Sequence, residues 1–403
     1  MDKIVIIGGG ASGLTCAIKA KNDNNEVIIL EKNDVCGKKI LATGNGKCNY
    51  YNDNQDISNY NSFNTELISK IINDENISKV KNFFNELGLI PKIKNGYYYP
   101  MSEQASSIRN ILVNKAKEKD VKIITNCNVK EITKEDNKFV IKTTTHSIIC
   151  DKVVLSTGSY AGVKNIKDVN SYKILDNFNL MIENVLPTLV QLKGEGHYFR
   201  DWDGVRIDSN IKLYEDDKFI KEENGQIQLT NYGVSGICVF NLSSKISRGL
   251  SHHKKEELVI DFLPTIDNLD EYFNRRSKIL GNYKILDFLE GLINTKLVHT
   301  ILSILNIDKN KTYNDLSITE KSKLVNMIKS FKLKITGTND YTKAQTCTGG
   351  LDLEELNLNT MEVIKVPNLY VIGEIIDLDG ICGGYNLTIA WLTGILAGSD
   401  LND

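Results

Sequence analysis

The first thirty residues alternate between apolar runs and glycine-rich or polar segments, in a pattern typical of a βαβ unit. Residues Ile4 to Ile7 are apolar and predict a strand close to the start of the chain. A run of glycines follows, and then a segment rich in Ala, Leu and Ile that predicts a helix. Residues Val27 to Leu30 predict a second strand, which ends at Glu31. This order predicts that the chain opens with a Rossmann-like unit.

The glycines of this turn have the spacing G-x-G-x-x-G, with Gly8, Gly10 and Gly13 at its fixed positions. Gly8 makes the tight turn, Gly10 lets the backbone approach a pyrophosphate, and Gly13 lets the helix pack closely on the strand. Glu31 stands where an acid accepts a hydrogen bond from a ribose hydroxyl. An acid there disfavours the 2′-phosphate of NADP, while FAD and NAD both remain open from this stretch.

The end of the chain repeats the same order of elements. Residues 368–374, NLYVIGE, predict a strand that ends in a glycine and an acid, and residues Leu387 to Gly398 predict an apolar helix. Gly383 and Gly384 lie between them. Pairing the two ends of the chain in one sheet predicts a discontinuous α/β domain. The C-terminal helix would then point its positive end at the cofactor.

The middle of the chain has a different pattern. Residues 191–265 look β-rich, and residues 266–340 look helical, with Ser317 and Glu320 at capping-box spacing. We therefore expect a Rossmann-like domain built from residues 1–190 and 341–403, with a β-rich domain and a helical domain inserted. The insertion contains no second G-x-G-x-x-G, so we expect no separate nicotinamide domain.

The amino-acid composition excludes some classes of function but does not identify one. The formal net charge is −2 and charged residues make up 25% of the 403, which is ordinary for a soluble surface and does not indicate a nucleic-acid partner. The eight cysteines include no C-x-x-C pair, which argues against a disulfide framework, a zinc site and a dithiol centre. We expect no bound metal, no signal peptide and no membrane span, and hence a cytoplasmic protein.

A glycine- and lysine-rich segment, NDVCGKKILATGNGKCN at residues 33–49, follows the acid. Its glycines allow a ligand to approach the backbone, and Lys38, Lys39 and Lys47 can contact phosphate. A solvated loop is the alternative interpretation.

Four other residues have two readings. Cys48 and Cys382 could form a flavin-coupled redox pair, but scattered reduced cysteines are the simpler interpretation. Tyr385 could donate a proton or pack at a helix start. Trp202, in GHYFRDWDG, could face a substrate or anchor a loop.

Four segments together resemble the BaiN-like (HI0933-like) family of FAD-dependent oxidoreductases. They are GKKILATGNGKCN at 37–49, YYPMSEQAS at 98–106, NGQIQLTNYGVSG at 224–236, and the segment from TCTGGLDLEEL to GGYNLTIAWLTG at 346–394. The resemblance implies a Rossmann-like FAD-binding domain of the two-dinucleotide-fold flavoprotein type, with an inserted β-barrel-like domain and a small helical domain. The chain departs from the family pattern at Lys47, where Arg is usual, and at Asn231, where His is frequent.

The resemblance also implies which positions hold non-covalent FAD. They are Gly8, Gly10, Ala11, Ser12 and Gly13 at the pyrophosphate; Glu31 at the adenosine ribose, beside Lys32 and Lys39; Val129 at the adenine; Gly46, Lys47, Cys48 and Asn49 along the flavin; Thr157 and Gly158 as a second glycine contact; Gly373, Glu374 and Asp379 toward the ribityl chain and pyrophosphate; and Gly384, Tyr385, Asn386 and Leu387 at the isoalloxazine ring. No catalytic acid is identified.

The function that these features favour is transfer of hydride from NAD(P)H through the flavin to a small organic acceptor. Family resemblance suggests that the acceptor contains a conjugated C=C bond. A flavin-dependent oxidase or monooxygenase is the enzymatic alternative, and a flavin-binding redox sensor is the non-enzymatic one. An RNA-modifying flavoenzyme is disfavoured because no basic stripe is visible. The choice between NADH and NADPH and the oligomeric state stay open.

Overall fold

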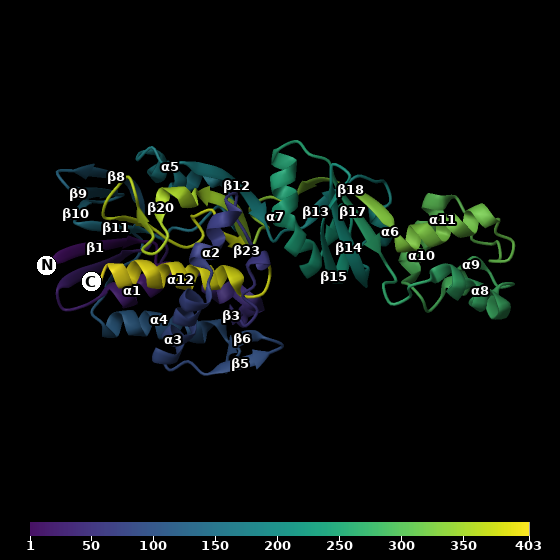
Figure 1. Ribbon diagram of the computed structural model, residues 1–403, viewed down its shortest axis with the longest axis horizontal. Helices are drawn as coiled ribbons and strands as arrows, with labels where there is room; N and C mark the ends of the chain where they lie inside the picture. The colour runs from purple at the N-terminus through teal and green to yellow at the C-terminus, as the bar shows by residue number, and fades with distance from the viewer. Residues whose placement is uncertain (403) are drawn as a thin grey trace. The chain divides into compact units, whose positions relative to one another are not determined.

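The computed structural model describes residues 1–402, so Asp403, the last residue of the expected Rossmann-like domain, lies outside the described part. The chain divides into two compact units: unit 1 contains residues 1–185 and 346–403, and unit 2 contains residues 186–345 (Figure 1). We expected the insertion to begin near residue 191 and to end near residue 340, so the observed insertion is slightly longer at both ends.

Unit 1 is built on a seven-stranded sheet with a parallel centre. Its strands, in order across the sheet, are β20 (Leu356–Asn357), β21 (Glu362–Val363), β22 (Leu369–Val371), β11 (Lys152–Leu155), β1 (Asp2–Ile7), β2 (Asn25–Leu30) and β7 (Lys122–Ile124). Ile4, Val5 and Ile6 in β1 are completely buried, as expected for a parallel strand that is covered on both faces. The two ends of the chain therefore share one sheet, and the α/β prediction is confirmed.

Helices α1 (Ala11–Ala20) and α12 (Tyr385–Asp400) lie side by side (Figure 1). A Cβ atom placed on Gly394 would lie 2.6 Å from the Ser12 carbonyl oxygen, and one on Gly398 would lie 2.7 Å from the Cys16 carbonyl oxygen. Only glycine permits this approach of the two backbones. Since Ser12 pairs with Gly394 and Cys16 with Gly398, the helices run in the same direction.

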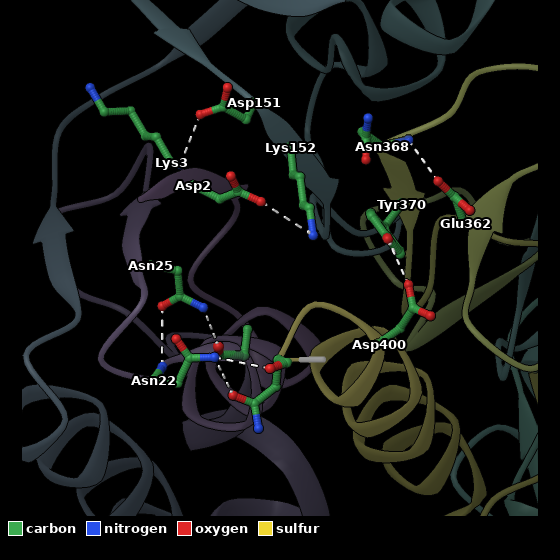
Figure 2. Close-up of polar contacts among 12 residues, drawn as sticks. Asp2, Lys3, Asn22, Asn25, Asp151, Lys152, Glu362, Asn368, Tyr370 and Asp400 are labelled. Carbon is green, nitrogen blue, oxygen red and sulfur yellow. Dashed lines mark hydrogen bonds and ion pairs between the residues drawn. The ribbon is translucent and has the colours of Figure 1, made fainter.

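Polar contacts fasten the amino-terminal edge of this sheet (Figure 2). The Lys3 backbone N–H donates to Asp151 Oδ2 at 2.9 Å, and Lys152 Nζ lies 3.6 Å from Asp2 Oδ2. The Asn368 backbone N–H donates to Glu362 Oε1 at 2.7 Å. The first two contacts hold the beginnings of β1 and β11 together, and the third holds the beginning of β22 against β21.

Smaller elements complete unit 1. They are α2 (Ile68–Ile71), α3 (Asp74–Glu86), α4 (Ala105–Glu118) and α5 (Ser171–Asp176); a sheet of β8 (Val129–Glu135), β9 (Lys138–Thr143) and β10 (Ser147–Cys150); a sheet of β3 (Tyr51–Asn52), β6 (Tyr97–Pro100) and β5 (Pro91–Lys94); and the pairs β4 (Tyr60–Asn61) with β23 (Asp379–Gly380) and β12 (Ile182–Thr188) with β19 (Thr346–Leu351). No helix among residues 1–402 is long and apolar enough to cross a membrane.

Unit 2 contains a closed six-stranded barrel and a group of helices. The barrel order is β13 (Leu192–Gly194), β16 (Gly233–Ser235), β15 (Lys218–Thr230), β14 (Arg206–Glu215), β17 (Glu256–Asp261) and β18 (Phe331–Thr338). The helices are α6 (Phe199–Trp202), α7 (Ile237–Ser251), α8 (Leu269–Leu280), α9 (Ile285–Leu289), α10 (Thr295–Leu305) and α11 (Ile318–Lys329). Trp202 is buried and donates from Nε1 to the Thr230 carbonyl at 3.1 Å, so it anchors the loop around it.

Two expectations for this region were wrong in part. Helix α7 lies inside the stretch expected to be β-rich, because Cys238, Val239 and Leu242 recur at helical spacing and are buried. Strand β18 lies inside the stretch expected to be helical, because its residues alternate between buried and exposed. The capping box of Ser317 and Glu320 at the start of α11 is confirmed.

Candidate cofactor site

The glycine turn between β1 and α1 contains two glycines that the packing of the fold requires and one that it does not. A Cβ atom on Gly8, whose φ is +107°, would lie 2.4 Å from the Ser156 carbonyl oxygen, and one on Gly13 would lie 2.0 Å from the Gly8 carbonyl oxygen. Gly10 has an ordinary φ of −79°, and a Cβ atom there would meet nothing within 4 Å. Gly8 and Gly13 are thus required for packing, whereas Gly10 keeps a space open.

The amino end of α1 borders that space. Its N-cap, Gly10, offers no side-chain hydrogen bond, and the first turn, which contains Ala11 and Ser12, has no acidic residue. The first N–H groups of a helix lack intrahelical partners and carry partial positive charge. The turn is therefore suited to a pyrophosphate. Gly373, at the end of β22, reaches the same place, since a Cβ atom on it would lie 2.4 Å from Ser12 Oγ.

Glu31 lies beside the glycine turn, immediately after β2. Its Oε2 accepts from the Gly9 backbone N–H at 2.8 Å, and its Oε1 accepts from the Asn33 backbone N–H at 2.8 Å. A carboxylate has about four acceptor positions, so Glu31 can still accept from a ribose hydroxyl. Its carbonyl oxygen accepts from the Cys127 N–H at 2.9 Å, which places buried Val129 of β8 two residues further along.

A second group gathers where β11 and β22 end. Lys39 Nζ lies 3.4 Å from Glu374 Oε2 and 3.9 Å from the position of a Cβ atom on Gly158. Ser159 Oγ donates to the other oxygen of Glu374. Thr157 Oγ1 is buried and has no hydrogen-bond partner. The structure thus brings together four of the residues implied for the site from three distant parts of the chain.

The loop that leads into the segment implied to run along the flavin, Gly46 to Asn49, has an unusual backbone. Gly44, Asn45 and Gly46 have φ values of +54°, +54° and +82°, a run of left-handed residues that needs glycine or asparagine. Lys47 Nζ lies 3.5 Å from Glu103 Oε1, and half of the Lys47 side chain is exposed. This segment is therefore a tightly turned loop and belongs to no long helix or strand.

Cys48 and Asn49 follow this loop and are oriented differently from Lys47. Burial raises the pKa of the Cys48 thiol to about 11, so it stays protonated and unreactive near neutral pH. None of the eight cysteines, all of which lie among residues 1–402, forms a disulfide. Asn49 Oδ1 is buried without a partner and lies 3.1 Å from the position of a Cβ atom on Gly384. The amide of Asn49 therefore faces the start of α12.

The amino end of α12 is held by side chains from earlier in the chain. Gly384, its N-cap, has a φ of +94°. Tyr385 accepts at its hydroxyl from Asn59 Nδ2 at 3.2 Å. Asn386 bonds both backbone groups of Gly380, at 3.0 and 2.7 Å. The two remaining residues implied here are Asp379, buried and accepting from Asn61 Nδ2 at 3.2 Å, and Leu387, partly buried.

Two observations test whether these residues fit a bound group. Buried polar atoms in native proteins almost always have partners, yet Asn49 Oδ1 and Thr157 Oγ1 have none. Both positions belong to the cofactor shell that the family resemblance implies. The open space at Gly10 also indicates room for a bound group. The site therefore fits an elongated cofactor with a pyrophosphate.

Not every implied residue joins these groups. Lys32 is exposed and makes none of these contacts, and Val129 is connected to the Glu31 group only through the Cys127 N–H two residues before it. Sequence reasoning also missed three supports: Asn33 at Glu31, Ser159 at Glu374 and Asn59 at Tyr385. Only Asn33 carried a signal, because it stands two residues after the acid.

Comparisons with known proteins identify the family to which the chain is similar. The HI0933-like protein Rossmann domain matches residues 2–400. The chain is 35% identical over 402 residues to the 3-dehydro-bile acid delta(4,6)-reductase of Clostridium scindens, covering 99% of this chain and 98% of the relative. It is 26% identical over 402 residues to the ribosomal RNA dihydrouridine synthase of Escherichia coli, covering 98% and 97% of the two chains.

A solved structure has a similar fold. The 3-ketosteroid delta1-dehydrogenase of Sterolibacterium denitrificans, in complex with 1,4-androstadiene-3,17-dione, superposes with a TM-score of 0.51 at 11% identity, covering 100% of both chains. At this identity the likeness concerns the fold alone. The match over nearly the whole chain and the 35% identical reductase show that this protein is an oxidoreductase that belongs to the HI0933-like family.

Proposed function

We propose that the protein binds FAD without covalent attachment and uses NAD(P)H to reduce a C=C bond conjugated to a carbonyl group in a small organic acceptor. The observation that carries the FAD assignment is the glycine turn, where the open space at Gly10 borders the unpaired N–H groups of α1 and Glu31 lies alongside. The 35% identical relative, named a 3-dehydro-bile acid reductase, supports the reaction class.

FAD, when bound, supplies a carrier that accepts hydride from a nicotinamide and passes it to a carbon of the acceptor. The chain's own residues bind and orient it. The glycine turn and the amino end of α1 hold the pyrophosphate, and Glu31 holds the adenosine ribose. The amino end of α12 offers positive potential to the flavin segment, where negative charge develops on reduction.

Reduction of a conjugated C=C bond needs a proton as well as a hydride. We assign Tyr385 as the residue that holds this proton. Its hydroxyl accepts from Asn59 Nδ2, which leaves its own O–H free to donate. Burial raises the pKa of Tyr385 to about 12, so the phenol is protonated near neutral pH. Tyr385→Phe should lower kcat while leaving FAD bound.

Two classes of acceptor follow from the relatives. Dihydrouridine is uridine with one C=C bond reduced, so the named activities of both relatives concern reduction of such bonds. We favour a small organic acceptor because the reductase is the more similar relative and because a net charge of −2 does not favour binding to RNA. A conjugated 3-oxo steroid acid is therefore the first acceptor to try.

The test is anaerobic reduction of the FAD-loaded protein by NADH or by NADPH, followed by separate addition of 3-oxochol-4-enoic acid, its methyl ester or oxygen. The proposal expects bleaching of the flavin by a nicotinamide and rapid reoxidation by the enone. Reoxidation by oxygen alone would support the oxidase alternative. A protein that does not take up FAD would overturn the cofactor assignment.

The absence of a second G-x-G-x-x-G in the sequence makes alternation of donor and acceptor at one flavin face the simplest arrangement. Parallel lines in double-reciprocal plots are then expected, and Glu31→Ala should weaken FAD retention without changing the preference between NADH and NADPH. Intersecting lines would contradict alternation.

A further inference from the structure

The hairpin of β5 and β6 carries a row of lysine and tyrosine side chains on one face. Lys92 lies opposite Tyr99 and Lys94 lies opposite Tyr97 in the antiparallel register. Because side chains alternate between the faces of a strand, these four residues point to the same side. The tight turn at Asn95, with a φ of +51°, and the following glycine keep this register fixed.

Three lysines converge on one acid beside this face. Glu103 lies 2.6 Å from Lys94 Nζ and 3.5 Å from Lys47 Nζ, and it also pairs with Lys92. The hydrogen bonds from Lys92 and Lys94 hold the pKa of Glu103 at about 2, so the acid is ionised. Three ammonium groups around one carboxylate leave two positive charges in excess.

Stabilisation of the fold does not account for this arrangement. An exposed ion pair contributes at most about 1 kcal/mol, and one lysine is enough to form it. The additional ammonium groups repel one another across a short distance. Glu103 itself has a φ of +50°, a conformation that a residue other than glycine adopts at a cost.

The cluster adjoins the segment that the flavin ring would contact. A Cβ atom on Gly383 would lie 3.0 Å from Tyr97 Cε1 and 3.0 Å from Tyr385 Cε2. Lys47 directly follows Gly46, which is implied to run along the flavin. The hairpin face and the loop therefore approach the start of α12 together, within unit 1.

We propose that Lys47, Lys92 and Lys94 form a binding site for a carboxylate carried by the acceptor, with the Tyr97 ring against the acceptor's apolar body. This inference rests on the proposed function, because it places the anionic end of the acceptor at the edge of the cofactor site, with the apolar ring system between it and the reacting C=C bond. Glu103 is a positioning residue: it holds the ammonium groups in place before the acceptor arrives. Rotatable ammonium groups attract a carboxylate as point charges, which gives selectivity for acids over neutral acceptors.

The test compares an acid with its own ester. Binding of 3-oxochol-4-enoic acid and of its methyl ester to the oxidised FAD-loaded protein is measured by the change in the flavin absorbance spectrum, at low and at high salt. We expect the acid to bind at least about tenfold more tightly at low salt, with the difference shrinking as salt screens the charges. The double variant Lys92→Gln, Lys94→Gln should lose this difference and keep its affinity for the ester.

The matched control is Lys142→Gln, which removes one exposed lysine that pairs with Glu131 at 2.9 Å in the separate three-stranded sheet. It should leave the preference for the acid unchanged. Equal binding of acid and ester by the unmodified protein, no binding of either, or a preference that survives in the double variant would overturn the inference. Displacement of the acid by a uridine oligonucleotide that binds more tightly would assign the site to phosphate instead.

The two proposals fail separately. Failure of NAD(P)H-reduced protein to reduce the ester would refute the proposed reaction, whereas the binding comparison uses oxidised protein and needs no turnover. A preference for the acid with no reduction would therefore leave the anion site standing.

Discussion

The two edges of the parallel sheet in unit 1 treat their polar groups in opposite ways. At the amino-terminal edge, side chains and backbone satisfy one another. The Asn22 backbone N–H donates to Asn25 Oδ1 at 3.1 Å, and Tyr370 donates to Asp400 Oδ2 at 2.7 Å (Figure 2). Asn22 Nδ2 donates to the Asn402 carbonyl at 2.9 Å. At the carboxyl-terminal edge, Gly10 borders open space and Thr157 Oγ1 has no partner.

This difference follows from the direction of the strands. In an open α/β sheet, the carboxyl ends of the strands and the amino ends of the following helices meet at one edge, where N–H groups remain available to a ligand. The amino-terminal edge has no ligand to bind, so its polar groups pair with one another and stabilise the fold. Changes at the carboxyl-terminal edge should therefore affect cofactor retention. Changes at the amino-terminal edge should affect only the free energy of unfolding.

The largest loss of cofactor is expected for Gly10→Val. The new side chain would fill the space beside the turn, and we expect FAD affinity to fall by at least about a hundredfold, or about 3 kcal/mol. The unliganded fold should survive because φ at Gly10 is ordinary and no atom lies within 4 Å of the new Cβ. Equilibrium titration with FAD and thermal unfolding of the apoprotein measure the two effects.

Gly13→Ala is the control for this variant, since its Cβ atom would lie 2.0 Å from the Gly8 carbonyl oxygen. It should destabilise the apoprotein itself. If Gly10→Val unfolds the protein as severely as Gly13→Ala, Gly10 serves packing and the comparison between glycines is wrong.

A smaller loss of cofactor is expected for Thr157→Val. Valine has the same shape without the hydroxyl, so it removes the unpartnered buried oxygen. Replacing an unsatisfied polar group by an apolar one is neutral or stabilising, so the apoprotein should unfold at the same denaturant concentration or a higher one. FAD affinity should fall by about tenfold, the value of about one hydrogen bond. A less stable apoprotein with unchanged affinity would show that Thr157 has a structural partner.

The sequence predicted the features that lie in one contiguous stretch. The turn at Gly8–Gly13 and the acid at Glu31 follow from local spacing, and the strand and helix at the end of the chain follow from apolar runs. Strand β18 was missed because its short alternating run directly follows the last apolar helical pattern, which ends near Phe331, and was included in the helical domain without a period of its own. The convergence of three lysines on Glu103 could not be predicted, since it depends on the register of a hairpin and on a loop far from it in sequence.

No loss of cofactor is expected for Tyr370→Phe, at the opposite edge. The variant removes the hydrogen bond to Asp400 and should lower the free energy of unfolding by about 1 kcal/mol. Urea unfolding of the apoprotein measures this change, and a titration with FAD should give the affinity of the unmodified protein. Weaker FAD binding in Tyr370→Phe would mean that the two edges are coupled through α12.

An unpartnered buried oxygen does not always mark a ligand. Glu256, in β17 of unit 2, is buried opposite Glu215 of β14, and neither of its carboxyl oxygens accepts a hydrogen bond. Burial, and then the nearby charge of Glu215, raise the pKa of Glu256 to about 8, against the opposing effect of Lys254. A protonated Glu256 can donate to Glu215, so a shared proton explains this site without a ligand.

The sign of the effect follows from proton linkage. Between an ordinary value of 4.5 and about 8, the folded protein holds a proton on Glu256 that the unfolded chain has lost, so stability falls as pH rises through that window.

Glu256→Gln removes this titration and should stabilise the protein by about 1 to 2 kcal/mol at pH 8, after allowance for solvent screening, and much less at pH 5. Glu257→Gln, whose carboxylate pairs with Lys332 at 3.3 Å, is the neighbouring control and should lack the pH dependence. FAD affinity should be unchanged in both variants. A drop in FAD affinity in Glu256→Gln alone would show that unpartnered buried oxygens in unit 2 also belong to a ligand site. Such oxygens would then not be confined to the carboxyl-terminal edge of the sheet in unit 1.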